Sequence, residues 1–332
     1  METSLENIHS NFQVIQTILD LQYNQESNGL RYIKGEKTDM ILSEFMKEYL
    51  EYSKSFHTQS SHISARAALN EFQRIVGNVP ISNIGIKEIE NFVAIKRKKS
   101  VFTARRCFVT VAAAFKKACD WNYLDDNPFR NVTKPKLPEI PPRYFQKNEF
   151  KEIYQLIEDL NFKELCVVAV YTGMRQGELI NLRWENVNIN ERSIQVSNSE
   201  EFTTKSKKNR TVPMNEPVFD ILVCRKGRAS CDYVFCRDAK KLKRDYVSRK
   251  FKRYVRLAGV NDKLTFHSLR HTCASWMVQA GVSLYVVQKI LGHSSITVTE
   301  KYAHLQKSQL FEAIEKLRFE PDMHAFQRES NK

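Results

Sequence analysis

The sequence of 332 residues lacks any apolar run near the roughly 20 residues that a membrane-spanning helix needs. Its longest apolar stretch, LCVVAVYTGM, is much shorter and is typical of a buried helix. The N-terminal METSLENIHS has neither the basic segment nor the apolar segment of a secretory signal peptide. We therefore expect a cytoplasmic protein with no membrane partner.

The sequence also lacks the cysteine spacing of a disulfide framework or a zinc site. No pair of cysteines is separated by two residues, and their number is odd. We interpret them as ordinary reduced thiols. The seven cysteines lie at positions 107, 119, 166, 224, 231, 236 and 273.

Internal repeats and low-complexity segments are absent, and hydrophobic residues make up 42% of the chain against 27% charged residues. This composition is typical of a globular protein, and the chain is long enough for two domains, each with its own core. The net charge of +14 is concentrated. The segment from Lys205 to Arg256 contains seventeen Lys and Arg residues and five Asp and Glu residues, which gives it a net charge of +12. A solvated charged face is one interpretation, and a surface that binds a polyanion is the other.

Helical periodicity dominates residues 37–132, which we expect to form a helical domain. The segment that begins at Met40 places Ile41, Phe45, Tyr49 and Tyr52 on one stripe. Further helices are expected over residues 64–77, 85–99 and 103–124, the last with Thr103 as its N-cap.

Four prolines in TKPKLPEIPP indicate an extended linker over residues 133–143. Beyond it, residues 144–320 read as a second domain of helices that includes a small antiparallel sheet near residues 193–214. Residues 1–36 form an extension of unknown role without a clear strand pattern, and residues 321–332 form a polar tail. The expected fold class is therefore mainly α, with a small antiparallel β-sheet in the second domain.

Three segments carry polar residues that core packing does not require. In TGMRQGELINLRW, Arg175 follows a glycine turn, and Glu178 lies one helical turn further on, where it can hold the guanidinium. A structural salt bridge is the simpler interpretation of Arg175 taken alone.

In TFHSLRHTCASWMVQAG, we expect Thr265 to cap a helix. His267, Arg270 and His271 then share one helical face, opposite a core-facing side. Two histidines at this spacing can bind zinc, but the glutamate of the HExxH motif is absent.

In SLYVVQKILGHSSITVTEKYAH, Ser283 and Gly292 are expected to begin and end a helix, with His293 in the turn beyond and Tyr302 on a short following helix. Tyr302 alone reads most simply as a half-buried packing residue. Two arginines, histidines and a tyrosine together are what in-line attack on a phosphodiester requires, because fixed guanidinium groups stabilise the charge that develops on phosphate oxygens.

These motifs resemble those of the tyrosine recombinase (phage integrase) family. The family's catalytic set of Arg, Lys, His-x-x-Arg, His and Tyr matches this chain over residues 40–320. Lys205 is matched because the family places this lysine in a turn between two strands, eight residues before a proline that is Pro213 here. Lys207 and Lys208 are alternatives in the same turn. The matching residues are Arg175, Lys205, His267, Arg270, His293 and Tyr302.

The resemblance implies that Tyr302 attacks a DNA phosphate and forms a 3′-phosphotyrosyl link, with no cofactor and no metal ion. A tyrosine with a pKa near 10 needs a base, for which His267 is the candidate. Arg175 and Arg270 would stabilise the pentacoordinate phosphorus. Lys205 would protonate the leaving 5′-oxygen.

His293 would hydrogen-bond a phosphate oxygen, and Glu178 would support Arg175. The implied partners are double-stranded DNA with inverted-repeat core sites, further copies of the chain in a tetramer on DNA, and an accessory directionality factor. The two domains would close on DNA as a C-shaped clamp. The apolar stripe of Leu310, Ile314 and Leu317 would pack either within its own chain or into a neighbouring copy. A relaxing topoisomerase and a non-catalytic DNA-binding protein remain alternatives.

Overall fold

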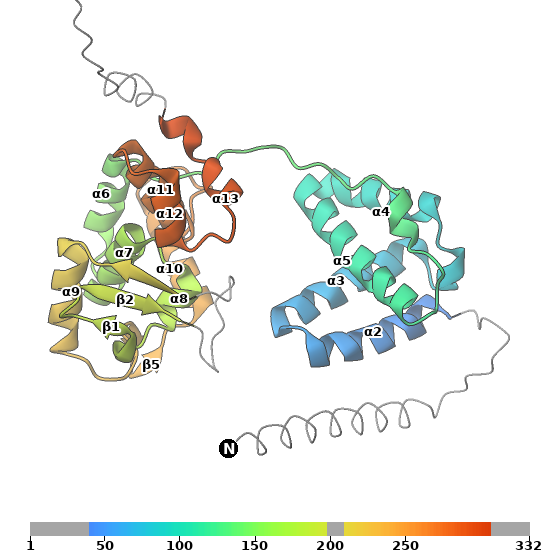
Figure 1. Ribbon diagram of the computed structural model, residues 1–332, viewed down its shortest axis with the longest axis horizontal. Helices are drawn as coiled ribbons and strands as arrows, with labels where there is room; N and C mark the ends of the chain where they lie inside the picture. Colours follow the sequence, from blue (N-terminus) through green and yellow to red (C-terminus); the bar gives the residue numbers. More distant parts are fainter. Residues whose placement is uncertain (1–39, 198–208, 307–332) are drawn as a thin grey trace, which may run out of the picture. The chain divides into compact units, whose positions relative to one another are not determined.

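The computed structural model describes residues 40–197 and 209–306, which divide into two compact units between Glu139 and Ile140 (Figure 1). This division lies inside the proline-rich segment that the sequence indicates as a linker. Within the described ranges, no helix has the length and apolar character to cross a membrane.

The first unit is a bundle of helices around an aromatic core. Phe45, Phe72 and Phe115 are completely buried, and the ring centroids of Phe72 and Phe92 lie 4.9 Å apart in an edge-to-face contact. Aromatic pairs of this geometry add to the free energy gained by burial. The elements are α2 (Leu42–Phe56), α3 (Gln59–Val76), η1 (Ile81–Asn83), α4 (Ile86–Lys99), α5 (Val101–Asp120) and η2 (Pro128–Asn131).

Two helix starts differ from the sequence-based expectation. Helix α3 begins at Gln59, where the Thr58 hydroxyl accepts a hydrogen bond from the Ser61 backbone N–H. Helix α5 begins at Val101 because the Ser100 hydroxyl accepts the Phe102 N–H at 3.2 Å. Each start therefore lies N-terminal to the expected one, and the prediction of Thr103 as an N-cap was wrong.

The second unit combines helices with two small sheets (Figure 1). Its elements are α6 (Lys147–Leu156), α7 (Leu160–Thr172), α8 (Gln176–Ile180), η3 (Trp184–Asn186), β1 (Val187–Asn188), β2 (Ser193–Val196), β3 (Arg210–Pro213), α9 (Glu216–Lys226), β4 (Cys236–Arg237), β5 (Lys240–Lys241), α10 (Arg244–Leu257), α11 (Ser268–Gln279), α12 (Leu284–Leu291), α13 (Thr297–Glu300) and η4 (Ala303–Gln306).

The larger sheet has the strand order β1-β2-β3, with both pairs antiparallel. Ile194 of β2 lies opposite Val212 of β3, and both side chains are buried. This alternation of buried residues fixes the register, since a shift by one residue would expose them. The predicted fold class, mainly α with a small antiparallel sheet in the second domain, is confirmed.

Helices α7 and α11 lie in the core of the second unit. Cys166, Val168 and Ala169 are buried on different sides of α7, which is typical of an internal helix. Helix α11 is fixed near its start by the Thr272 hydroxyl, which accepts the Phe145 N–H at 2.9 Å. This buried position gives the polar residues of α11 a rigid support.

Candidate active site

Arg175 is placed by the sharp end of α7. Gly173 ends this helix with a φ of 61°, in the left-handed region that favours glycine. A Cβ at this position would lie 2.3 Å from Cδ2 of Leu291, so the close contact with α12 also requires glycine. Arg175 follows as the residue that precedes α8.

Glu178 is the buried carboxylate that organises the site. Its Oε1 accepts a hydrogen bond from Nη1 of Arg175 at 2.8 Å, as the sequence pattern suggested. Its Oε2 accepts a hydrogen bond from the Arg175 backbone N–H, also at 2.8 Å. The same two oxygens also accept Nη1 and Nη2 of Arg210, at 3.1 and 2.7 Å. Burial alone would raise the pKa of Glu178, but the hydrogen bonds from Arg210 and Arg175 hold it below its usual value.

Three arginines hold the C-terminal end of α12. Nε of Arg210 donates to the carbonyl of Ile290 at 2.9 Å, and Nη2 of Arg270 donates to that of Leu291 at 2.7 Å. Nη2 of Arg175 reaches the carbonyl of Gly292 at 3.4 Å. The last carbonyls of a helix lack partners within the helix and carry its negative dipole end, so guanidinium groups are suitable partners.

Arg270 is more enclosed than Arg175, the other candidate arginine, with 4% of its surface exposed. Its Nη1 donates to the carbonyl of Gly173 at 2.7 Å, so the guanidinium joins the ends of α7 and α12. Burial and the neighbouring charge of Arg175 lower the pKa of Arg270 to about 9, which keeps it charged at neutral pH.

Helix α11 starts later than the sequence suggests. It begins at Ser268 after His267, and the backbone N–H of Thr265 donates to the Ser268 hydroxyl at 3.1 Å. The prediction of Thr265 as the N-cap was therefore wrong. Because His267 already has helical backbone angles, it still lies beside His271, with ring centroids 4.9 Å apart.

Tyr302 lies in the turn between α13 and η4, not on a helix as expected. Its side chain is 3% exposed and packs with Cys273, Val278 and Leu291. Its hydroxyl oxygen lies 2.6 Å from Nδ1 of His271. Burial raises the pKa of Tyr302 to about 12, although the charge of Arg270 opposes the shift. The phenol is therefore protonated and in direct contact with an imidazole.

His293 follows the left-handed Gly292 at the end of α12, and both its ring and its backbone carbonyl take part in hydrogen bonds. Nδ1 of its ring lies 2.9 Å from the Thr299 hydroxyl, and its carbonyl accepts Nε2 of Gln288 at 3.2 Å. Burial, followed by the charges of Arg270 and Arg175, lowers its pKa to about 3. His293 is thus a neutral hydrogen-bonding group beside the arginines.

Acid is expected to destabilise the fold through His271 and His293. In the unfolded chain each imidazole takes up a proton near pH 6.5, whereas the folded pKa values are about 4 and about 3. The unfolded chain then binds more protons, so the free energy of unfolding falls as the pH is lowered through this window. The melting temperature should decrease between about pH 7 and about pH 5. The decrease should be smaller in the double variant His271→Asn/His293→Asn; equal slopes would contradict this cause.

The structure brings five of the six candidate catalytic residues, and Glu178, into the second unit around the ends of α7, α11 and α12. Lys205, with Lys207 and Lys208, lies outside the described residues. Two further residues belong to the site that the motifs did not single out. Arg210 was one of many cations in a basic region, and His271 was noted only for sharing a helical face with His267 and Arg270 and as half of a possible zinc-binding pair.

The basic region includes structural residues. Arg210 is buried on Glu178, and Arg225 is buried on Glu164 and donates to the carbonyl of Val234. In contrast, Lys240 and Lys241 of β5 are exposed. Part of the positive charge therefore stabilises the fold and is not free to contact a polyanion.

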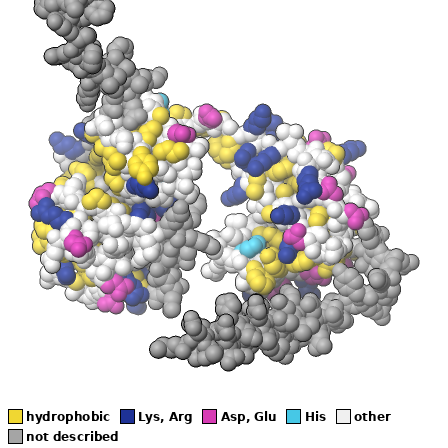
Figure 2. Space-filling view, in the orientation of Figure 1, with side chains coloured by type: hydrophobic (Ala, Val, Ile, Leu, Met, Phe, Trp, Pro, Cys, Tyr) yellow, Lys and Arg dark blue, Asp and Glu magenta, His cyan; other side chains and the backbone are white. Residues whose placement is uncertain are grey.

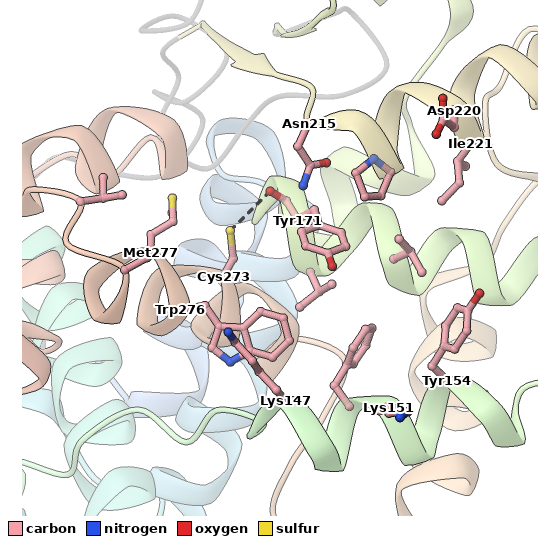
Figure 3. Close-up of a pocket in the computed structure, with 16 residues that line it drawn as sticks. Lys147, Lys151, Tyr154, Tyr171, Asn215, Asp220, Ile221, Cys273, Trp276 and Met277 are labelled. Atoms are coloured by element: carbon pink, nitrogen blue, oxygen red, sulfur yellow. Dashed lines mark hydrogen bonds between the residues drawn. The ribbon is translucent and has the colours of Figure 1, made fainter.

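A separate groove of about 880 Å³ lies over α6, α7, α9 and α11. Figure 3 shows the aromatic side chains of Tyr154, Tyr171 and Trp276 that line it, together with Asp220 from α9 and Lys147 from α6. None of the five candidate catalytic residues that the structure describes lines this groove. The groove adjoins the cluster around Tyr302 through Cys273, which belongs to both.

A family model for the phage integrase family matches residues 143–309. A tyrosine recombinase of Thermosipho africanus is 25% identical over 288 residues, which cover 82% of this chain and 98% of that protein. Tyrosine recombinase XerA of Pyrococcus furiosus is 30% identical over 193 residues, covering 56% of this chain and 65% of that protein.

Solved structures show the same fold. The integrase of the transposon Tn1549 in complex with transposon right end DNA aligns with a TM-score of 0.69 at 19% identity, covering 84% of this chain and 99% of that one. A lambda integrase tetramer bound to a Holliday junction aligns with a TM-score of 0.68 at 19% identity, covering 85% and 87%. The resemblance inferred from the motifs is confirmed: the chain belongs to the phage integrase family of tyrosine recombinases.

Proposed function

We propose that this chain is a site-specific DNA recombinase that cuts and rejoins strands through a 3′-phosphotyrosyl intermediate. The observation that carries the proposal is the cluster of Arg175, Arg270 and His293 at the ends of α7, α11 and α12, with Tyr302 packed against α11 and α12 from the turn after α13. In-line displacement at phosphorus needs a nucleophile and fixed positive charges, and this cluster supplies both. The covalent bond to Tyr302 conserves the energy of the phosphodiester, so rejoining needs no nucleotide cofactor.

Arg175 and Arg270 are suited to hold the non-bridging phosphate oxygens. Each guanidinium has five N–H groups, of which two per side chain are used in the contacts described above. The remaining N–H groups can donate to phosphate, and Glu178 and the helix-end carbonyls fix the planes of the guanidinium groups. His293, being neutral, would add a hydrogen bond to a phosphate oxygen.

The first unit supplies a basic surface suited to DNA. The last turn of α4 exposes Arg97, Lys98 and Lys99, whereas Lys96 of the same turn is buried and pairs with Glu71. Figure 2 shows Lys and Arg side chains over the face that carries α4 and α5. We propose that this unit is the core-binding domain and that both units contact the backbone phosphates of one duplex as a C-shaped clamp.

Strand exchange requires two duplexes, and we propose a tetramer on inverted-repeat DNA sites as its working form. Leu310, Ile314 and Leu317, for which the sequence leaves packing within the chain or into a neighbouring copy open, lie outside the described residues. Integration, excision and dimer resolution all use this chemistry, and a directionality factor would choose among them. Because the proposed substrate is DNA, we propose that the enzyme acts in the cytoplasm, at the nucleoid.

Covalent capture tests the function. Sheared total DNA from cells that encode the chain is incubated with the protein and denatured in detergent, and the DNA that stays on protein is sequenced. Fragments with one inverted-repeat motif are expected, and a plasmid with two such sites should give recombinants. Diffuse fragments with relaxation of plasmids would indicate a topoisomerase. DNA binding without covalent DNA would indicate a non-catalytic binding protein.

Lys205 is proposed to protonate the 5′-oxygen as it leaves, and its replacement tests that role. Lys205→Ala should slow cleavage of ordinary DNA by about 10²-fold or more, the usual scale for losing a general acid. The rate should recover on a substrate whose 5′-bridging atom is sulfur, because a thiolate leaves without a proton. Equal defects on both substrates would remove Lys205 from this role.

A further inference from the structure

We propose that His271 is a catalytic residue whose Nδ1 takes the proton from the Tyr302 hydroxyl as its oxygen attacks phosphorus. The proposal rests on the proposed function, since it assigns the base for the same reaction. It names a residue that the family-like motif of Arg, Lys, His-x-x-Arg, His and Tyr does not include.

The geometry favours His271 over His267. Nδ1 of His271 lies 2.6 Å from the Tyr302 oxygen, within the range of a direct proton transfer. The His267 ring packs edge-on against the His271 ring, with a centroid distance of 4.9 Å. Tyr302 is enclosed by apolar side chains, so His271 is the proton acceptor that its hydroxyl meets in this structure.

The surroundings keep His271 neutral. The charged and titratable groups that face its ring are His267 just before α11, Arg270 on α11, Lys301 after α13 and His293 after α12. Burial first, and then the electrostatic effects of His267, Arg270 and Lys301, lower the pKa of His271 to about 4. At physiological pH the imidazole therefore has a free lone pair, and Nδ1 can accept while the proton stays on Nε2.

A weak base is sufficient at this position. As the bond between the Tyr302 oxygen and phosphorus forms, that oxygen loses electron density and its proton becomes strongly acidic. The O–H bond breaks toward His271, the new O–P bond forms, and the electron pair of the P–O5′ bond leaves with the 5′-oxygen, which takes a proton from Lys205. In the rejoining step the imidazolium returns its proton to Tyr302, so no further reactant is consumed.

The test uses a duplex of the sequence recovered by covalent capture, and it measures the single-turnover rate of covalent complex formation. His271→Asn retains an amide that can hydrogen-bond the phenol but cannot take its proton. We expect a rate about 10²- to 10⁴-fold lower with unchanged DNA affinity. His304→Asn, an exposed histidine in η4, is the matched control and should react at the wild-type rate.

Difluorotyrosine at position 302 separates proton transfer from positioning. Its phenol ionises readily, so it needs little help from a base. In the His271→Asn background it should restore most of the lost rate. A defect that is equally large with tyrosine and difluorotyrosine would overturn the proposal, because His271 would then only position the phenol and not take its proton.

A measurement on the unaltered protein tests the proposal even if the variant fails to fold. Nitrogen NMR of the free enzyme should show His271 with a bare Nδ1 and a proton on Nε2; a proton on Nδ1 would overturn the proposal. If the wild type forms no covalent DNA, the proposed function itself fails. If the wild type reacts, Tyr302→Phe does not, and His271→Asn keeps the full rate, only the role of His271 fails.

Discussion

Tyr302→Phe should form no detectable covalent complex with DNA, while its affinity for DNA and the salt dependence of that affinity stay unchanged. The substitution removes one oxygen from a buried ring and leaves the arginines in place. Phosphate contacts by Lys and Arg determine the salt dependence, and none of them involves the phenol. The measurement is detergent-resistant retention of labelled duplex, together with binding at several salt concentrations.

Tyr285→Phe is the matched control, because Tyr285 is exposed on α12 and takes part in no contact of the cluster around Glu178 and Tyr302. It should cleave at the wild-type rate. A Tyr302→Phe protein that still becomes attached to DNA would show that another residue is the nucleophile. Loss of DNA affinity in the same variant would instead indicate a packing role for Tyr302.

Glu178→Ala should have the largest effect on stability. It leaves the guanidinium groups of Arg175 and Arg210 without their shared carboxylate, and the Arg210 side chain is 7% exposed. Removing one partner of a buried ion pair costs about 3–5 kcal/mol, since the remaining charge stays desolvated. We expect a decrease of this size in the free energy of unfolding from denaturant titration, and loss of cleavage by at least about 10²-fold.

Glu216→Ala is a suitable comparison in the same unit. Glu216 pairs with Arg192 at 2.7 Å, but both side chains are about half exposed or more. Exposed pairs contribute at most about 1 kcal/mol. Similar losses of stability in the two variants would contradict the buried, doubly paired position assigned to Glu178.

Local patterns in the sequence predict much of the fold. Ser283 and Gly292 begin and end α12 as expected, with the Ser283 hydroxyl accepting the Val286 N–H and Gly292 in the left-handed region. The apolar alternation near Ile194 and Val212 predicts the antiparallel pair. These features depend on residues close together in the chain, so a single sequence contains the information.

The missed features depend on distant partners. Arg210 and Glu178 are in contact although they lie 32 residues apart in the sequence, and His271 and Tyr302 are in contact although they lie 31 residues apart. Nothing near Arg210 in the sequence distinguishes it from the exposed cations of the basic region. The position of Tyr302 in a turn was missed because α13 ends at Glu300, after a single helical turn. The candidate residues were found through the family resemblance, whereas their contacts required the structure.

The most direct test of the account is to identify the amino acid that becomes bound to DNA. The covalent complex would be digested with nuclease and trypsin, and the modified peptide sequenced by mass spectrometry. We predict a nucleotide attached through its 3′-phosphate to the peptide that follows Lys301, with the modification on Tyr302. A nucleotide on any other residue, or one attached through its 5′-phosphate, would contradict the account.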